Sequence, residues 1–308
     1  MSNTPFKPLI AVVGPTSSGK SDLAVQIALF INSQKKYFGV EASEVISADS
    51  RQVYKGMDIG TGKVTRKEMR GVPHHMLDIA SPKRVYTASQ YQRDARKILE
   101  KIWKKGGVPV LCGGTGFYIQ SLLEGTQIPS VKPDPSLRKR LGEKTVEELF
   151  LILKSKDPRR SENIDSQNPH RLIRAIEIAE NLGYVPKIKY KPLKCAALKI
   201  GISIPQKELG ERIHARLHKR IREGMFEEII NLHKSGVSWK RLEGLGLEYR
   251  YGSFFLRRRM EKKEAVESLE REIRKYAKRQ MTWFKRDKDI RWIQKPEDSL
   301  KLVQNFLT

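Results

Sequence analysis

Gly14-Pro15-Thr16-Ser17-Ser18-Gly19-Lys20-Ser21 is a P-loop sequence with the full GxxxxGKS spacing. It follows the apolar run 9–13 and precedes the helical pattern 23–28, so it joins a predicted strand to a predicted helix. In such a loop backbone N–H groups surround phosphate oxygens, the lysine adds a full positive charge, and the Ser21 hydroxyl can ligate Mg²⁺. A tight connection without ligand is the alternative. The loop predicts a phosphate-rich ligand and leaves the reaction open, because kinases, NTPases and some transferases share it.

Residues 44–49 form a second predicted strand, which has Asp49 at its carboxyl end. In open α/β sheets ligands bind beyond the carboxyl ends of the strands, so Asp49 is expected to face the same crevice as Lys20. Its carboxylate could be a Mg²⁺ partner, a general base, or only a cap for the next turn. The nearby P-loop favours a chemical role.

Further strands are predicted at residues 73–79 and 108–112, and an amphipathic helix at 88–104. The strand 108–112 runs into Gly113-Gly114-Thr115-Gly116, where a P-loop NTPase often has an acidic Mg²⁺ ligand. We therefore expect backbone and a small hydroxyl to approach the ligand there. His74 and His75 have no second ligand cluster at workable spacing, so they are interpreted as structural residues or as part of the site wall.

The length of the chain indicates how many structural units it forms, and its net charge indicates the kind of partner it binds. A chain of 308 residues is expected to form one α/β domain and a smaller second unit. Sixty Lys and Arg against 35 Asp and Glu leave a net charge of +25, which points to a polyanionic partner, with nucleic acid as the leading candidate. A basic surface without such a partner is the alternative.

The cysteines and the apolar runs bear on location. Cys112 and Cys195 lie far apart without CxxC spacing, so neither a disulfide framework nor a zinc site is indicated. No apolar run approaches the roughly 20 residues of a membrane span, and the N-terminus shows no signal pattern. The sequence predicts a cytoplasmic protein without membrane contact.

Six motifs carry a resemblance to a known family. They are GPTSSGKS (14–21), SADSRQVYKGMDIGT (47–61), PHHMLDI (73–79), VLCGGTGFY (110–118), NPHRLIRA (168–175) and AKRQMTW (277–283). In this order they closely resemble the tRNA dimethylallyltransferases, also called tRNA isopentenyltransferases, over nearly the whole chain. The Cys/His zinc extension of eukaryotic members is absent, which indicates a bacterial-type member, expected to be monomeric.

The resemblance implies a reaction: transfer of a dimethylallyl group from dimethylallyl diphosphate to N6 of the adenosine immediately 3′ of the anticodon (A37), giving N6-isopentenyladenosine and pyrophosphate. The P-loop, residues 14–21, then holds the diphosphate leaving group with Mg²⁺ on Ser21, rather than ATP. Asp49 matches the family's base, because the adenine N6 sheds a proton as it attacks. Thr16 matches the residue that contacts the bridging oxygen, and Arg216 matches an arginine that reaches the pyrophosphate.

The tRNA, through its anticodon stem-loop, is the implied macromolecular partner. The residues expected to contact it are Asp49, Ser50, Arg51, Gln52, Thr115, His170, Arg171, Arg174 and Arg250. Glu248 stands where many members have glycine, which puts the role of Arg250 in doubt.

The expected fold is α/β: a P-loop NTPase-like parallel sheet flanked by helices, with an inserted all-helical domain. The composition becomes charged and helix-forming, with prolines as punctuation, at 128–197, so we assign the core to 1–127 and 198–308. In the insert, Arg171 and Arg174 share a helix face that follows His170. This face could track phosphates, or it could be merely solvated.

The last third of the chain is expected to be mostly helical. A helix at 210–222 carries Arg212, Arg216 and Arg220 at i, i+4 and i+8. A helix at 261–286 buries Val266, Leu269, Ile273 and Ala277, and exposes Arg271, Arg274, Lys275, Lys278 and Arg279. Its basic surface is expected to grip an RNA backbone independently of sequence.

Two other functions compete with the transferase. A small-molecule P-loop kinase would need a nucleoside triphosphate as phosphoryl donor. A non-catalytic RNA-binding protein would leave Asp49, Thr16 and the P-loop without a purpose.

Overall fold

The computed structural model describes residues 7–308, which divide into two compact units. The core unit comprises 7–125 and 192–308, and the insert comprises 126–191. The sequence placed these boundaries at 128 and 197. The chain re-enters the core earlier than expected, because Ala196 and Ala197 already pair with β1 as part of β5.

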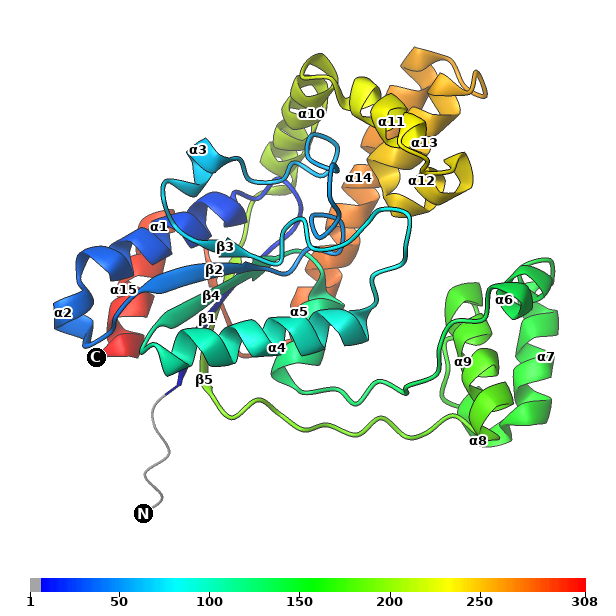
Figure 1. Ribbon diagram of the computed structural model, residues 1–308, viewed down its shortest axis with the longest axis horizontal. Helices are drawn as coiled ribbons and strands as arrows, with labels where there is room; N and C mark the ends of the chain where they lie inside the picture. The colour runs from blue at the N-terminus through cyan, green and yellow to red at the C-terminus, as the bar shows by residue number, and fades with distance from the viewer. Residues whose placement is uncertain (1–6) are drawn as a thin grey trace. The chain divides into compact units, whose positions relative to one another are not determined.

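The core unit contains a six-stranded parallel sheet with the order β3-β2-β4-β1-β5-β6 (Figure 1). The strands are β1 (Pro8–Val13), β2 (Ser43–Ser47), β3 (His74–His75), β4 (Val108–Gly113), β5 (Ala196–Ile202) and β6 (Ile290–Ile293). The expected parallel α/β fold is confirmed. Because all strands are parallel, their carboxyl ends lie along one edge, where the P-loop follows β1 and Asp49 follows β2.

One strand is shorter than predicted. The predicted strand spans 73–79, whereas β3 stops pairing after His75. Met76 and Asp78 adopt positive φ values of 64° and 55°, which turn the chain out of the extended conformation. The two histidines have local partners: His74 Nδ1 lies 2.8 Å from the Val72 carbonyl oxygen, and His75 Nε2 lies 2.5 Å from Glu44.

Helices cover both faces of the sheet. Ile10 and Val12 of β1 belong to the apolar cluster formed with α1 (Lys20–Ser33) and α15 (Pro296–Leu307), whereas Leu9 and Ala11 belong to the cluster formed with α4 (Ala88–Lys104) and α5 (Gly116–Leu123). This alternation is that of a strand buried on both faces. The predicted helix 88–104 is confirmed to the residue, and Thr87 caps it through a capping box with Gln90.

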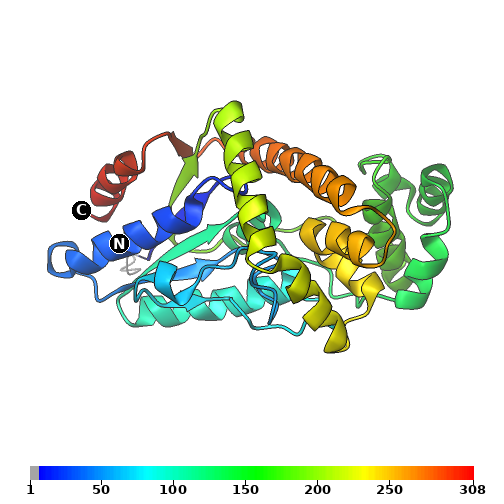
Figure 2. The ribbon, with the colours of Figure 1, turned by 90° about the horizontal axis from the view of Figure 1, so that it is seen from above.

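A helical layer packs beyond the carboxyl edge of the sheet (Figures 1 and 2). It consists of α10 (Gln206–Arg222), α11 (Met225–Lys234), α12 (Trp239–Leu245), α13 (Leu247–Leu256) and α14 (Lys262–Phe284). Leu269, Ile273 and Ala277 of α14 are buried in its apolar cluster, as expected. Val266 is only half-buried, because it lies at the margin of that cluster. Two short helices complete the core unit, α2 (Lys35–Phe38) and α3 (Arg66–Met69).

The insert is all-helical and has its own apolar cluster. Its helices are α6 (Pro135–Leu141), α7 (Val146–Lys156), α8 (Pro158–Ser161) and α9 (Pro169–Leu182). Three of the prolines that mark the segment stand at helix N-termini, where the missing N–H costs nothing. Glu177 of α9 is 0% exposed and forms ion pairs with Arg138 and Arg174.

Within residues 7–308, no helix combines the length and the apolar character needed to cross a membrane. Cys112 is buried and Cys195 is partly buried, and both are free thiols.

Candidate active site

The P-loop lies between the end of β1 and the start of α1. Gly19 has a φ of 85° and Ser17 a φ of 61°, so the chain reverses within a few residues and directs successive N–H groups inward. Lys20 folds back over the loop and donates to the Pro15 carbonyl oxygen at 3.1 Å. Burial lowers the pKa of the Lys20 ammonium below its ordinary value, an effect that Asp49 partly opposes. An anionic ligand would remove that penalty.

A cavity of about 340 Å³ adjoins the loop. It is enclosed by the carboxyl edge of the sheet and by α10, α13 and α14. The predicted site residues that line it are Thr16, Lys20, Ser21, Asp49, Ser50, Arg51, Gln52, Arg216 and Arg250. All of them belong to the core unit, so one cavity brings together the phosphate loop, the candidate base and most of the predicted tRNA contacts.

Asp49 caps the turn that follows β2. Its Oδ1 accepts hydrogen bonds from the backbone N–H groups of Arg51, at 2.8 Å, and Gln52, at 3.3 Å. Among residues 7–308, Oδ2 has no hydrogen-bond partner. The cap therefore orients the carboxylate and leaves one oxygen available to the cavity, so a capping role and a chemical role are compatible.

Gln280 of α14 ties the P-loop to the glycine turn after β4. Its Oε1 accepts from the Thr16 N–H at 2.8 Å, and its Nε2 donates to the Gly114 carbonyl oxygen at 2.8 Å. A Cβ on Gly114 would lie 2.3 Å from Gln280 Nε2, which explains why glycine stands there. Gln280 belongs to the motif 277–283, but the motif alone does not indicate this role. The side chain is 6% exposed and fixes the residue expected to contact the leaving group.

Thr115 binds Ser50, a residue that lines the cavity. Its Oγ1 accepts from the Ser50 N–H at 3.0 Å and lies 3.3 Å from Ser50 Oγ. Ser50 lines the cavity, whereas Thr115 does not. The structure therefore gives Thr115 the position of a support for Ser50, and a direct contact between Thr115 and tRNA stays a prediction.

Two arginines of α10 point towards the same cavity. Arg216 donates to the Gly62 carbonyl oxygen at 3.2 Å, and burial, followed by the repulsion of Arg220, lowers its pKa to about 10. Arg216 also lines a second hollow on the other side of the P-loop, together with residues 17–22. It is thus placed to reach an anion held by the loop.

Arg220, to which the sequence analysis assigned no role, is 7% exposed and also lines the cavity. It donates to the Gly60 carbonyl oxygen at 3.1 Å and forms a 3.2 Å ion pair with Glu248. Glu248 therefore supplies the counter-charge of a buried arginine. The sequence pattern around Arg220 does not indicate Glu248 as its partner, and the pattern around Glu248 does not indicate Arg220.

Glu228 of α11 fixes the loop that these arginines contact. Its carboxylate accepts from the N–H groups of residues 58, 59 and 60, at distances of 2.6–3.0 Å, and from the Tyr249 hydroxyl at 2.7 Å. A Cβ on Gly60 would lie 2.8 Å from the Tyr249 ring, so glycine is required for this contact. Glu228 thus holds the acceptors of Arg216 and Arg220 in place.

Arg250 of α13 lines the cavity and donates from Nε to the Glu243 carbonyl oxygen at 3.1 Å. In the insert, His170 and Arg171 are exposed, and Arg171 forms a 3.6 Å ion pair with Asp165. Arg174 differs, because its guanidinium binds Glu177 and donates to the Pro129 and Val131 carbonyl oxygens. Arg174 therefore stabilises the insert, and tRNA contacts by all of these residues stay predictions.

The basic residues of α14 are exposed, as expected, but several are partly neutralised. Arg274 pairs with Glu270, Lys275 pairs with Glu272, and Arg271 donates to Ser268. Lys278 and Arg279 form no ion pair within residues 7–308.

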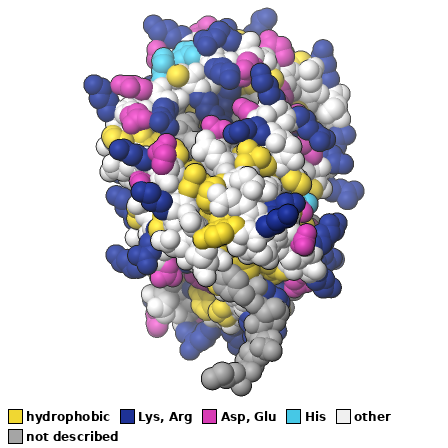
Figure 3. Space-filling model, turned by 90° about the vertical axis from the view of Figure 1, so that its left-hand side faces the viewer, with side chains coloured by type: hydrophobic (Ala, Val, Ile, Leu, Met, Phe, Trp, Pro, Cys, Tyr) yellow, Lys and Arg dark blue, Asp and Glu magenta, His cyan; other side chains and the backbone are white. Residues whose placement is uncertain are grey.

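On the face drawn in Figure 3, Lys and Arg side chains are spread widely and outnumber Asp and Glu. The positive charge on this face is not confined to one patch.

Comparisons with known proteins agree on one family. A family model described as "IPP transferase" matches residues 52–287. The "tRNA dimethylallyltransferase" of Pelotomaculum thermopropionicum is 37% identical over 295 residues, which cover 93% of this chain and 90% of the relative. The "tRNA dimethylallyltransferase 2" of Treponema denticola is 41% identical over 282 residues, which cover 90% of this chain and 91% of the relative.

Solved structures give the same result. The full-length tRNA isopentenylpyrophosphate transferase of Bacillus halodurans aligns with a TM-score of 0.72 and 30% identity, covering 98% of this chain and 97% of that one. A eukaryotic dimethylallyltransferase acting on tRNA aligns with a TM-score of 0.71 and covers 94% of this chain and 74% of that one. At 23% identity, the second likeness shows the shared fold.

Proposed function

This chain belongs to the IPP transferase family, and from that premise we propose how its cavity performs dimethylallyl transfer to tRNA. We propose that the enzyme transfers a dimethylallyl group to N6 of the adenosine immediately 3′ of the anticodon, and its relatives carry the name tRNA dimethylallyltransferase. The observation that carries the proposal is a single cavity lined by three charged side chains. They are Lys20 of the P-loop, Arg216 of α10 and Asp49, which follows β2. We propose that dimethylallyl diphosphate binds between them.

The diphosphate end is assigned to the P-loop. Its N–H groups, the Lys20 ammonium and the Arg216 guanidinium would neutralise the pyrophosphate as the allylic C1–O bond breaks. Thr16, whose N–H is held by Gln280, would contact the bridging oxygen. Because Lys20 and Arg216 are partly buried cations with lowered pKa values, the arriving negative charge would stabilise them in turn.

The donor set is suitable for Mg²⁺, which prefers hard oxygen ligands and substrate phosphates. Ser21 is exposed at the first turn of α1 and lines both hollows beside the P-loop. Its hydroxyl would hold the ion together with the diphosphate. When bound, Mg²⁺ supplies further neutralisation of the leaving group.

The acceptor end is assigned to Asp49. As N6 of adenine forms its bond to C1, the amine carries an extra proton, and Asp49 Oδ2 would accept it. Oδ1 is already held by two backbone N–H groups, so the carboxylate needs no reorganisation before the transfer. The balanced step gives N6-isopentenyladenosine, free pyrophosphate and protonated Asp49.

A small-molecule kinase is not favoured. Strand β4 ends in Gly113 and the Gly114 carbonyl binds Gln280, so no acidic side chain stands where many P-loop NTPases place a Mg²⁺ ligand. The named relatives are tRNA dimethylallyltransferases. A cytoplasmic location and a monomeric state stay predictions.

The test is mass spectrometry of nucleosides after incubation of the protein with unmodified tRNA, dimethylallyl diphosphate and Mg²⁺. We expect up to one N6-isopentenyladenosine for each tRNA, with equimolar pyrophosphate. Lys20→Ala is the negative control. The proposal would be contradicted if folded protein and unmodified tRNA yielded no isopentenyladenosine. It would also be contradicted if the protein instead transferred a phosphoryl group from a nucleoside triphosphate.

A further inference from the structure

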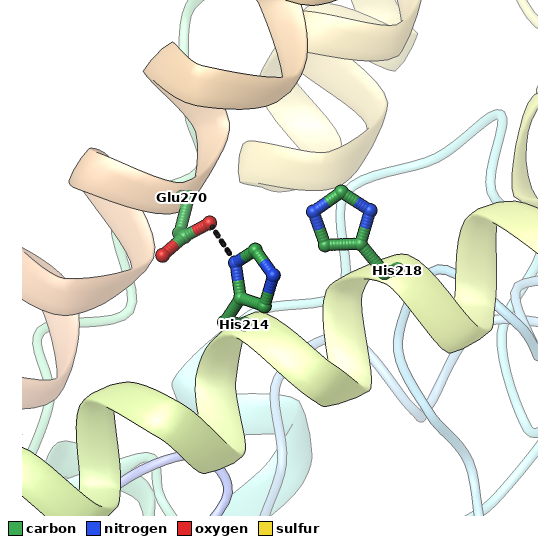
Figure 4. A group of neighbouring side chains, drawn as sticks. All are labelled: His214, His218 and Glu270. Carbon is green, nitrogen blue, oxygen red and sulfur yellow. Dashed lines mark hydrogen bonds and ion pairs between the residues drawn. The ribbon is translucent and has the colours of Figure 1, made fainter.

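A cluster of three metal-ligating side chains lies on the helical layer. His214 and His218 are four residues apart on α10, and Glu270 stands on the neighbouring helix α14. Figure 4 shows both rings on the same side of α10, with the Glu270 carboxylate directed at His214. One ligand atom from each residue lies within 4.8 Å of the others. None of the three lines the active-site cavity.

The helix geometry explains why the rings converge. Residues four apart on an α-helix lie one above the other on the same face, and a histidine pair with this spacing can bind one metal ion. The two ring centroids are 4.3 Å apart. Both helices belong to the core unit and pack against each other, so the third ligand is held at a fixed place.

Glu270 is held in position by groups outside the cluster. Its Oε1 accepts from Arg274 Nε at 3.1 Å and from Nη2 at 2.6 Å, and Arg274 also donates to the Gly210 carbonyl oxygen at 3.0 Å. Its Oε2 lies 2.9 Å from His214 Nδ1. Arg274 thus orients the carboxylate and leaves Oε2 to face the histidines, the arrangement by which hydrogen bonds to a ligand organise metal sites.

We propose that His214, His218 and Glu270 form a Zn²⁺ site that joins α10 to α14. Two imidazoles and one carboxylate are a ligand set that Zn²⁺ accepts, with water as the fourth ligand. Tetrahedral bonds of about 2.0–2.1 Å require ligand atoms about 3.3 Å apart. His214 is exposed, and His218 and Glu270 are partly buried, so rotation of these side chains would bring the ligand atoms to this separation, and Zn²⁺ would replace the proton between His214 and Glu270.

The site would act on the active-site cavity through the helices. α10 carries Arg216 and Arg220, and α14 carries Gln280. A metal bound to both helices restrains their relative movement and stabilises the folded state by mass action. The proposal is independent of the proposed function, because it needs neither tRNA nor the diphosphate.

The experiment titrates the metal-free full-length protein with Zn²⁺ alone by isothermal calorimetry, and with Co²⁺ as a spectroscopic probe. We expect one ion for each chain, a Co²⁺ spectrum of low coordination number, and a melting temperature that rises with the concentration of free Zn²⁺. His218→Ala and Glu270→Gln should each weaken binding more than tenfold, since removal of outer partners alone costs about that much.

Two features keep the test specific. His218 has no hydrogen bond among residues 7–308, so its variant should melt like the wild type without metal, and Gln at 270 can still accept from Arg274. His170→Ala, which removes an exposed histidine of the insert, is the matched control and should bind Zn²⁺ unchanged. Absence of binding to the wild-type protein, or equal binding by the His218 and Glu270 variants, would overturn the proposal.

Discussion

Replacing Asp49 by asparagine separates the three roles that its position allows. Asparagine keeps the side-chain shape and an Oδ1 acceptor, so the hydrogen bonds from Arg51 and Gln52 persist. Asp and Asn cap helix and turn starts about equally well, and we expect the free energy of unfolding to change by less than about 0.5 kcal/mol. The variant therefore removes the base without removing the cap.

The expected loss falls on the chemical step. General-base catalysis contributes about 10²–10⁴-fold, equivalent to about 2.7–5.4 kcal/mol in the activation free energy. Single-turnover prenylation with saturating tRNA and dimethylallyl diphosphate measures this rate, and the affinities for both substrates should change by about tenfold or less. Asp289→Asn, at an exposed carboxylate outside the cavity, is the control and should react like the wild type.

Titration with Mg²⁺ distinguishes the base from a metal ligand. A variant that lacks only the base stays slow at every Mg²⁺ concentration. Recovery of the rate at high Mg²⁺, together with weakened diphosphate binding, would refute the base assignment in favour of a ligand role. Wild-type activity of the Asn variant at ordinary Mg²⁺ would remove Asp49 from the mechanism.

Four further changes test other parts of the structure. Lys20→Ala should nearly abolish turnover and leave tRNA affinity, measured by filter retention, close to that of the wild type; a large loss of tRNA binding would contradict this. Gln280→Leu leaves two backbone partners unpaired, at about 1–3 kcal/mol each, and should lower kcat more than tRNA affinity in steady-state assays. Replacing Lys275 and Lys278 by Ala should flatten the salt dependence of tRNA binding by up to about one unit for each lost phosphate contact, and an unchanged slope would mean that these charges are only solvated. Glu177→Ala removes the buried carboxylate that binds two partly exposed arginines and should destabilise the insert by about 1–3 kcal/mol in chemical denaturation.

The sequence predicted best what local patterns determine. The P-loop, the parallel strands and the helix at 88–104 depend on apolar periodicity, glycine spacing and capping residues that are close together in the chain. The strand predicted at 73–79 was wrong beyond His75, because an apolar composition does not reveal the positive φ values of Met76 and Asp78.

The site residues that belong to a sequence motif were predicted. The contacts between residues that are far apart in the chain were not. Gln280 contacts Thr16 across 264 positions of the chain, and Glu228 contacts the N–H groups of residues 58–60 across about 170. A glutamine or a glutamate in a charged helix gives no sign of such a partner. Arg174 shows the converse, since its helix position suggested solvent or phosphate whereas its guanidinium is bound to Glu177.

The hydrogen bond between the Thr16 N–H and Gln280 also has a consequence for synthesis of the protein on the ribosome. The P-loop is made well before the side chain that holds its Thr16 N–H, which is translated 264 residues later. Strands β5 and β6, on one side of β1, likewise follow the whole insert. Closing such long loops is slow, because entropy is lost before the distant contacts form. A nascent chain that ends before α14 can fold the insert, but it lacks the side chain that holds the P-loop, so diphosphate binding should appear only after α14 has been translated.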